Sequence, residues 1–244
     1  MQQVVFLGPS LLFFTAILLV PFAIGIYYSF TEWNGISSNP KWVGLDNLRT
    51  IFLGDETFRN SFWFTVRYSI VNIALINLVA FLFALLLTRA LKWRKAYRTI
   101  YFLPNVIGGL LLGYIFQFIY TRGIPSIGSL TGIEYLSTPW LGTPETAFWG
   151  AILIGVWQNA GYMMMIYIAG IINIPAELTE AANMDGAEGW RIVRHITIPL
   201  LMPSFTICLF LTISSSFKAF DQILSLTGGG PFKSTEVVAM DIYN

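Results

Sequence analysis

The sequence has 244 residues, of which 55% are hydrophobic and only 11% are charged. This small number of charged side chains excludes an ordinary soluble globular protein. We therefore expect the chain to lie in a lipid bilayer. The formal net charge of +1 gives no basic footprint for nucleic acid, and we expect no such partner.

Five stretches without Asp, Glu, Lys or Arg are each long enough to cross a membrane. About 20 apolar residues in a helix span the ~30 Å hydrocarbon core. The stretches are residues 1–31, 68–88, 99–121, 146–176 and 196–217. The sequence therefore predicts an all-α, polytopic membrane protein with about five spans.

The first stretch could instead be a signal peptide. It lacks a basic start, is longer than the apolar region of such a peptide, and has no small-residue cleavage site before Thr31. We interpret it as a retained first span.

The connecting loops predict the orientation. Residues 89–98 carry five basic residues and no acid, which indicates a cytoplasmic loop. Residues 122–145 contain one basic and two acidic residues among turn formers, which favours the outside. Alternation then returns the loop with Arg191, Arg194 and His195 to the cytoplasm.

That cytoplasmic loop, residues 175–199, contains the signals of a short helix. Pro175 suits the first helical position, Glu177 and Glu180 favour the positive helix end, and Gly186 is a natural stop. These positions predict a helix of about two to three turns.

One face of this helix is suited to contact another surface. Its small side chains permit close approach, and its members recur at helical spacing: Leu178, Ala181, Ala182 and Asp185. We expect Trp190 and Val193 to anchor a second short helix before Pro199. A simple amphipathic interfacial loop is the alternative interpretation.

After the fifth span, the sequence Leu-Thr-Gly-Gly-Gly-Pro at residues 226–231 predicts an external turn. A sixth helix can begin near Glu236, but residues 236–244 are too few to cross the hydrocarbon. We expect the last span to be missing from this sequence, with a nonmembrane C-terminal tail as the alternative.

The spacing of Glu-Ala-Ala at residues 180–182, Gly186, Ile196 and Ile198-Pro199 resembles the EAA loop of ABC-importer permeases. Ile198 stands where that family usually has leucine. Further stretches resemble successive motifs of carbohydrate-type ABC permeases and extend the likeness over nearly the whole chain: residues 30–33, 44–48, 97–104 and 226–231. The last of these, followed by Ser234-Thr235, is similar to the MalF-like or UgpA-like member of a permease pair.

This resemblance implies a type I ABC importer transmembrane domain that covers residues 1–244 and moves a sugar, oligosaccharide or polyol inward. It implies four kinds of partner: a second homologous permease, two cytoplasmic ATPase subunits, an extracytoplasmic solute-binding protein and the carbohydrate itself. ATP and Mg²⁺ belong to the ATPases, with no cofactor in this chain. Coupling to the ATPases falls on Glu180, Ala181, Ala182, Asp185 and Gly186. The expected location is the cytoplasmic (inner) membrane of a bacterium or archaeon.

The sequence offers little covalent chemistry. Residues 229–234 end in Lys-Ser, but Thr227 and Phe232 occupy both glycine positions of a phosphate-binding loop. One histidine and one cysteine give neither a metal cluster nor a Cys/His pair. We therefore expect a transport subunit and not an enzyme.

Polar residues within spans are costly unless they are paired or face water. They are Asn72, Asn77, Asn105, Gln117, Gln158, Asn159, Lys218 and Asp221. Gln158 and Asn159, with Tyr162, combine amides and an aromatic ring, as a sugar's hydroxyl edge and apolar face require. The alternative interpretation, which the residues favour equally, is that these side chains form hydrogen bonds between helices.

On the fifth span, Ser214, Phe217, Lys218 and Asp221 recur at three- or four-residue steps, which predicts one helical stripe. Lys218 can pair with Asp221, or both can snorkel to the external interface. The family resemblance places substrate contacts in this region, so we expect a solute path here. An ion-coupled secondary transporter is the alternative function, with Asp221 as its candidate carboxylate.

Overall fold

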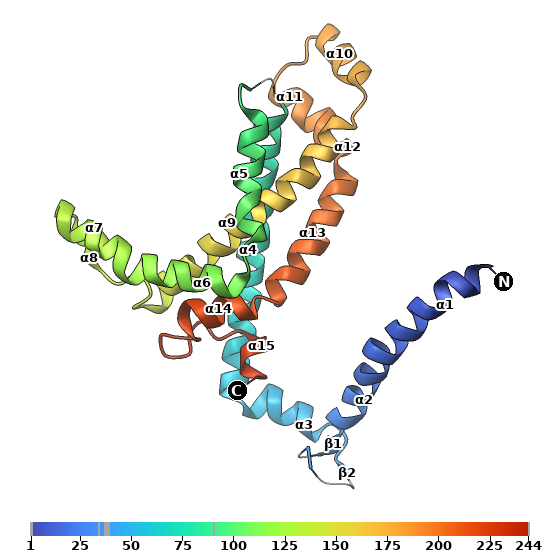
Figure 1. Ribbon diagram of the computed structural model, residues 1–244, viewed down its shortest axis with the longest axis vertical. Coiled ribbons are helices and arrows are strands. Elements are labelled where there is room, and N and C mark those ends of the chain that lie inside the picture. Colours follow the sequence, from blue (N-terminus) through green and yellow to red (C-terminus); the bar gives the residue numbers. More distant parts are fainter. Residues whose placement is uncertain (1, 34, 37–39, 90, 244) are drawn as a thin grey trace. The chain divides into compact units, whose positions relative to one another are not determined.

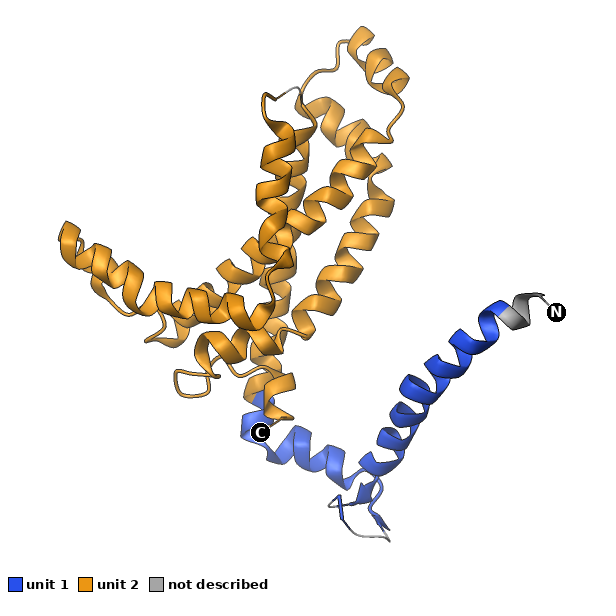
Figure 2. Cartoon of the chain, viewed as in Figure 1, with its two compact units in different colours: residues 1–59 blue, residues 60–244 orange. Residues whose placement is uncertain are grey.

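The computed structural model describes residues 2–33, 35–36, 40–89 and 91–243 (Figure 1). Met1 of the expected first span and Ala90 of the basic loop lie outside the described residues. The chain divides into two compact units, residues 1–59 and 60–244 (Figure 2). Helices dominate both units, which confirms the predicted all-α class.

Unit 1 begins with a long apolar helix. It consists of α1 (Gln2–Phe14), a π-helical segment η1 (Thr15–Leu19) and α2 (Val20–Ser29). The helix over residues 6–29 is long and apolar enough to cross a membrane, and none of the residues in its most apolar stretch is buried within the chain. This helix matches the expected first span in length and composition.

The rest of unit 1 is a small hairpin followed by short helices. Strands β1 (Thr31–Glu32) and β2 (Lys41–Trp42) pair antiparallel, with Thr31 opposite Trp42. The helical segments are α3 (Asp46–Arg49) and η2 (Thr50–Gly54). The Asn47 amide donates to the carbonyls of Ser29 and Thr31 at 3.0 and 2.9 Å, so it ties α3 to the end of α2.

Two long helices run through unit 2. They are α4 (Glu56–Thr88), which starts at the unit boundary, and α9 (Pro144–Ile172). Both pass the length and hydropathy test for a membrane span. Helix α9 begins with a capping box between Thr143 and Thr146, which satisfies backbone donors at its first turn. Aromatic pairs join α4 to α9: Phe64 with Phe148 and Phe81 with Tyr167.

The predicted third span is bent. Helix α5 (Arg94–Val106) meets the continuous segment α6 (Gly109–Phe118), η3 (Ile119–Gly123) and α7 (Ile124–Thr131) at 98°. Ile107 is extended at the break, with ψ at 127°, and Gln158 Nε2 of α9 donates to its carbonyl at 3.0 Å. The predicted stretch 99–121 is therefore part of a bent pair of helices, and the Gln158 side chain of a neighbouring helix satisfies a backbone carbonyl freed at the break.

The predicted fifth span is also divided. Segments α11 (Trp190–Ile192), η4 (Val193–Thr197) and α12 (Ile198–Leu200) form one helix that meets α13 (Met202–Phe217) at 70°. The remaining helices are α8 (Glu134–Ser137), α10 (Ala176–Met184), α14 (Phe220–Thr227) and α15 (Val238–Asp241). Among the described residues, three helices can span a membrane by length and composition, or up to five if each bent pair is one span.

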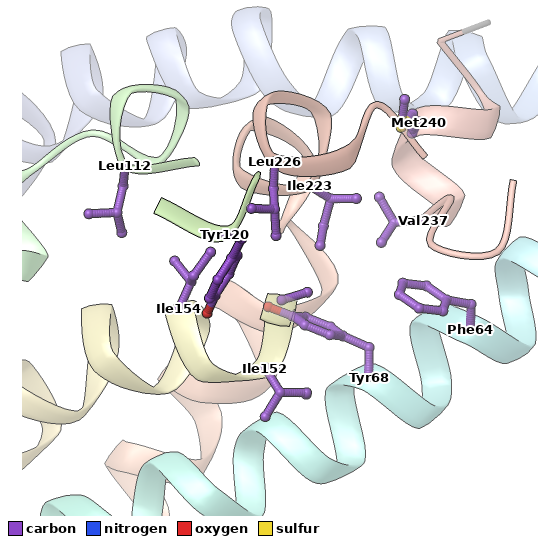
Figure 3. Packing of buried hydrophobic residues seen from close by; sticks show 11 residues of the cluster. Phe64, Tyr68, Leu112, Tyr120, Ile152, Ile154, Ile223, Leu226, Val237 and Met240 are labelled. Carbon is purple, nitrogen blue, oxygen red and sulfur yellow. The ribbon is translucent and has the colours of Figure 1, made fainter. Parts of the chain in front are cut away.

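The core of unit 2 consists of two hydrophobic clusters. The first joins α4, α9 and α14 through residues such as Phe64, Ile152 and Leu226 (Figure 3). The second joins α4, α9 and α13 through residues such as Ile76 and Cys208. Asn72 lies on α4 between the two, and a polar cavity lies at this position.

Candidate functional site

A polar cavity of about 160 Å³ lies between α4, α6, α9 and the junction of α13 with α14. Its lining residues are Tyr68, Asn72, Gly109, Gln158, Asn159, Ser215, Lys218, Ala219, Asp221 and Gln222. They come from positions far apart in the sequence, so the cavity exists only in the folded chain.

The cavity brings together four of the seven predicted solute-path residues. Gln158 and Asn159 reach it from α9, and Lys218 and Asp221 reach it from the α13–α14 junction. The other three, Ser214, Phe217 and Tyr162, do not line it. Their side chains belong to other parts of the helix surfaces.

The exposed aromatic members show this separation. Phe217 is 49% exposed, and Tyr162 is 37% exposed with its ring 6.4 Å from that of Phe102. Neither ring supplies a stacking platform inside this cavity.

The predicted stripe on the fifth span is wrong because the helix does not continue through it. Helix α13 ends at Phe217, and α14 begins at Phe220. The Phe220 N–H donates to the Lys218 carbonyl at 2.8 Å, which closes a tight turn. This turn carries Lys218 and Asp221 to the cavity and leaves Phe217 outside it.

Of the two alternatives for Lys218 and Asp221, an ion pair between them is absent from the described part of the chain. Both side chains are exposed. A cation and an anion therefore line one cavity without neutralising each other.

Two buried amides carry polar atoms that no protein group satisfies. Asn72 is 2% exposed and Gln222 is 6% exposed. Asn72 Oδ1 and Gln222 Nε2 have no hydrogen-bond partner among the described residues. Burial of an unpaired amide costs about 1–3 kcal/mol, so an acceptor on α4 and a donor on α14 are left unsatisfied on residues that line the cavity.

Other polar residues of the spans form interhelical hydrogen bonds. Tyr167 Oη donates to Asn77 Oδ1 at 2.7 Å, and Asn77 Nδ2 donates to Thr212 Oγ1 at 3.1 Å. Gln117 Nε2 donates to the Leu226 carbonyl at 3.1 Å. These amides hold helices together and have little capacity left for a ligand.

Gln158 and Asn159 combine both roles. Gln158 Nε2 binds the Ile107 carbonyl at 3.0 Å, and Asn159 Nδ2 binds the Gly155 carbonyl at 2.9 Å. Their amide nitrogens stabilise backbone, while both residues line the cavity.

Sequence reasoning missed Tyr68, Ser215 and Gln222 as cavity residues. Gln222 follows Asp221 directly, so a prediction of the turn at Lys218 would have found it. Helix α14 is held against α6 at Gly113, where a Cβ would collide with Ser225. This close approach brings Gln222 against the start of α6.

The predicted coupling helix is present as α10 (Ala176–Met184), and Gly186 follows it with φ at +77°. The Ala187 N–H donates to the Ala182 carbonyl at 2.9 Å, and the Gly186 N–H donates to the Asn183 carbonyl at 3.1 Å. These two bonds form a Schellman motif, which confirms Gly186 as the stop.

Two details of this segment differ from expectation. Pro175 precedes the helix, with ψ at 129°, and does not occupy its first turn. Trp190 is 62% exposed and does not anchor the second helix, whereas Val193 packs against the second core cluster.

No residue of α10 is buried. Leu178 is 44% exposed, and Glu180, Ala181 and Asp185 are also exposed, with Ala182 half-buried. Figure 1 shows α10 at the end of unit 2 opposite to α14 and α15. The face with small residues is therefore open to another molecule.

Comparison with known proteins gives consistent results. Residues 51–244 match the family described as binding-protein-dependent transport system inner membrane component. The chain is 45% identical to a probable starch degradation products transport system permease protein, AmyD, of Thermoanaerobacterium thermosulfurigenes, over 98% of this chain and 80% of that protein. It is 33% identical to the multiple sugar-binding transport system permease protein MsmF of Streptococcus mutans, over 92% and 77% of the two chains.

The fold also matches a solved structure. A bacterial ABC transporter involved in the import of the acidic polysaccharide alginate superposes with a TM-score of 0.84 at 24% identity, covering 98% of this chain and 82% of the other. At this identity the likeness supports the fold alone.

Proposed function

This chain belongs to the family of binding-protein-dependent transport system inner membrane components, and we propose that it is the permease subunit of an ATP-driven carbohydrate importer. The polar cavity carries the proposal. Sugar hydroxyls both donate and accept hydrogen bonds, and the cavity offers an unpaired acceptor at Asn72 and an unpaired donor at Gln222. A sugar bound here would satisfy both buried amides.

The names of the relatives support a carbohydrate as the solute. They refer to starch degradation products and multiple sugars, and a 31% identical relative from Thermococcus litoralis is a trehalose/maltose permease. The family membership gives no support to the ion-coupled alternative.

The connectivity of α10 suggests how coupling would work. Helix α10 joins α9, which carries Gln158 and Asn159, to the bent helix that leads through α13 to Lys218. Ile174 and Ile198, on either side of α10, pack against the second core cluster. A displacement of α10 would therefore move both helices that contribute to the cavity, and alternating access follows from their relative motion.

This mechanism assigns separate roles to partner chains. Two cytoplasmic ATPase subunits would bind ATP and Mg²⁺ and push α10, while a second permease would complete the solute path. A related importer has been crystallised with its periplasmic protein bound to an alginate pentasaccharide, which supports a solute-binding protein as the donor of the solute. The chain itself moves between conformations and performs no covalent step.

Transport by the reconstituted complex tests the proposal. The complex is placed in vesicles with its solute-binding protein and ATP, and uptake of a panel of labelled sugars is measured. We expect ATP-dependent uptake of at least one sugar, with none when ATP is replaced by a nonhydrolysable analogue. Uptake driven by an ion gradient without ATP would contradict the proposal.

A further inference from the structure

Two further cavities lie along α4 and α9, apart from the polar cavity. One has a volume of about 570 Å³ and the other about 430 Å³, and Trp149 lines both. The two cavities adjoin at Trp149, and together they are called here the α4/α9 groove.

Each helix contributes a row of residues at four-residue intervals. Such rows form continuous ridges along a helix surface. The α4 row is Arg67, Val71, Leu75, Val79 and Phe83. The α9 row is Glu145, Trp149, Leu153, Trp157 and Gly161. Each row extends over roughly 24 Å at 1.5 Å per residue, within a hydrocarbon core of ~30 Å.

The groove has one polar end. Arg67 and Glu145 immediately precede the charge-free stretches 68–88 and 146–176, so they lie where the two apolar spans begin. Beyond them, the row side chains as far as Phe83 and Trp157 are aliphatic or aromatic. The groove is therefore amphiphilic, with its charges at the membrane boundary.

The groups at the polar end are not neutralised by the chain. No ion pair joins Arg67 to Glu145 in the described part of the chain, and the Arg67 Nε–H donates only to the Trp63 carbonyl, at 3.4 Å. Ser234 lines the same cavity, and its buried hydroxyl has no partner among the described residues. A cation and an anion are thus available to one occupant, and an unpaired buried hydroxyl belongs to a residue of the same lining.

We propose that the α4/α9 groove binds a zwitterionic membrane phospholipid of the phosphatidylethanolamine class. The phosphate accepts from the Arg67 guanidinium and the Ser234 hydroxyl, and the ammonium donates to the Glu145 carboxylate. An acyl chain lies along the apolar rows, where Trp149, Leu153 and Trp157 are 57%, 51% and 44% exposed. A sugar is a poor occupant because, beyond Arg67 and Glu145, the side chains of these rows offer no acceptor and only the indole N–H donors of Trp149 and Trp157. An apolar helix is poor because it leaves both charges unpaired.

Photolabelling tests this proposal independently of transport. The purified transporter complex is placed in bilayers with trace phosphatidylethanolamine or phosphatidylglycerol, both with the same photoreactive acyl chain. Labelled peptides are mapped by mass spectrometry. We expect phosphatidylethanolamine to label α9 around Leu153 and Trp157 in preference to phosphatidylglycerol.

Variants separate the two headgroup contacts. Arg67→Gln should reduce labelling by both lipids by about threefold, and Glu145→Gln should remove the preference for phosphatidylethanolamine. Arg59→Gln and Glu134→Gln are matched controls outside the groove and should change neither. Leu153→Trp fills the apolar row without altering a charge, and it should also reduce labelling if the charge variants assemble poorly.

Two results would overturn the proposal. Equal labelling by both lipids, unchanged in Arg67→Gln and Glu145→Gln, would show ordinary surrounding lipid. An efficient cross-link from Leu153→Cys to another subunit would show that a protein helix fills the groove.

Discussion

Helix α10 and the polar cavity are built in opposite ways. Helix α10 comes from one short stretch, ends in its own Schellman motif and buries none of its residues. The cavity gathers residues from α4, α6, α9 and α14, with Asn72 and Gln222 almost fully buried. A local signal thus produces the exposed helix α10, whereas the polar cavity depends on long-range packing.

The largest expected effect is at Gly186. Valine at φ +77° is strained by roughly 1–3 kcal/mol, so Gly186→Val should distort the end of α10 and reduce ATP-driven uptake about tenfold or more. Uptake and ATPase stimulation are measured in the reconstituted complex.

Gly132→Val is the matched control. Gly132 also has open space around it and a φ of +71°, at the end of α7. It carries similar strain in a loop without the coupling motif, so uptake should be retained. Equal losses in the two variants would make the Gly186 effect one of folding and not of coupling.

The next effect concerns the unpaired acceptor of the cavity. Asn72→Leu keeps a similar volume but removes Oδ1, together with the Nδ2 donor to Tyr68 Oη and Ser216 Oγ at 3.4 and 3.3 Å. A sugar would lose one hydrogen bond in a buried site, and its apparent affinity should fall about tenfold. Asn105→Leu is the control, because Asn105 is a polar span residue that does not line the cavity. If both variants assemble and transport every sugar with the parental affinity, Asn72 Oδ1 does not bind the sugar.

The two regions also differ in how far the sequence predicts them. Proline, glutamates and glycine within 175–186 specify α10 locally, so its length and stop were predictable. Pro104 and the pair Gly108-Gly109 signal the break after α5, although hydropathy alone treats residues 99–121 as one span. The turn at Lys218 and Ala219 has no proline or glycine, so the sequence pattern predicts a helix that continues through these two residues. Only packing of α14 against α6 reveals that Lys218 and Asp221 reach the cavity without Phe217.

A smaller effect is expected where span polarity is already satisfied. Tyr167→Phe removes the hydrogen bond to Asn77 at 2.7 Å and should lower stability by about 1 kcal/mol. Thermal unfolding of the complex measures this change, and sugar affinity should remain parental. If Tyr167→Phe loses as much sugar affinity as Asn72→Leu, the assignment of Asn77 to structure and of Asn72 to sugar binding is wrong.

The smallest effect should come from Phe217. Its ring is 49% exposed and lies outside the cavity, so Phe217→Ala creates no buried void and removes no cavity contact. We expect uptake and sugar preference to change by less than about twofold, within the ±0.5 kcal/mol typical of surface substitutions.

Lys218→Ala, one residue further, removes a cavity charge and should alter the preference between neutral and anionic sugars, measured in the same uptake panel. If Phe217→Ala shifts that preference as strongly as Lys218→Ala, the aromatic ring contacts the solute in another conformation of the transporter, and the continuous stripe predicted from helical spacing describes that state better than the turn at Lys218 does.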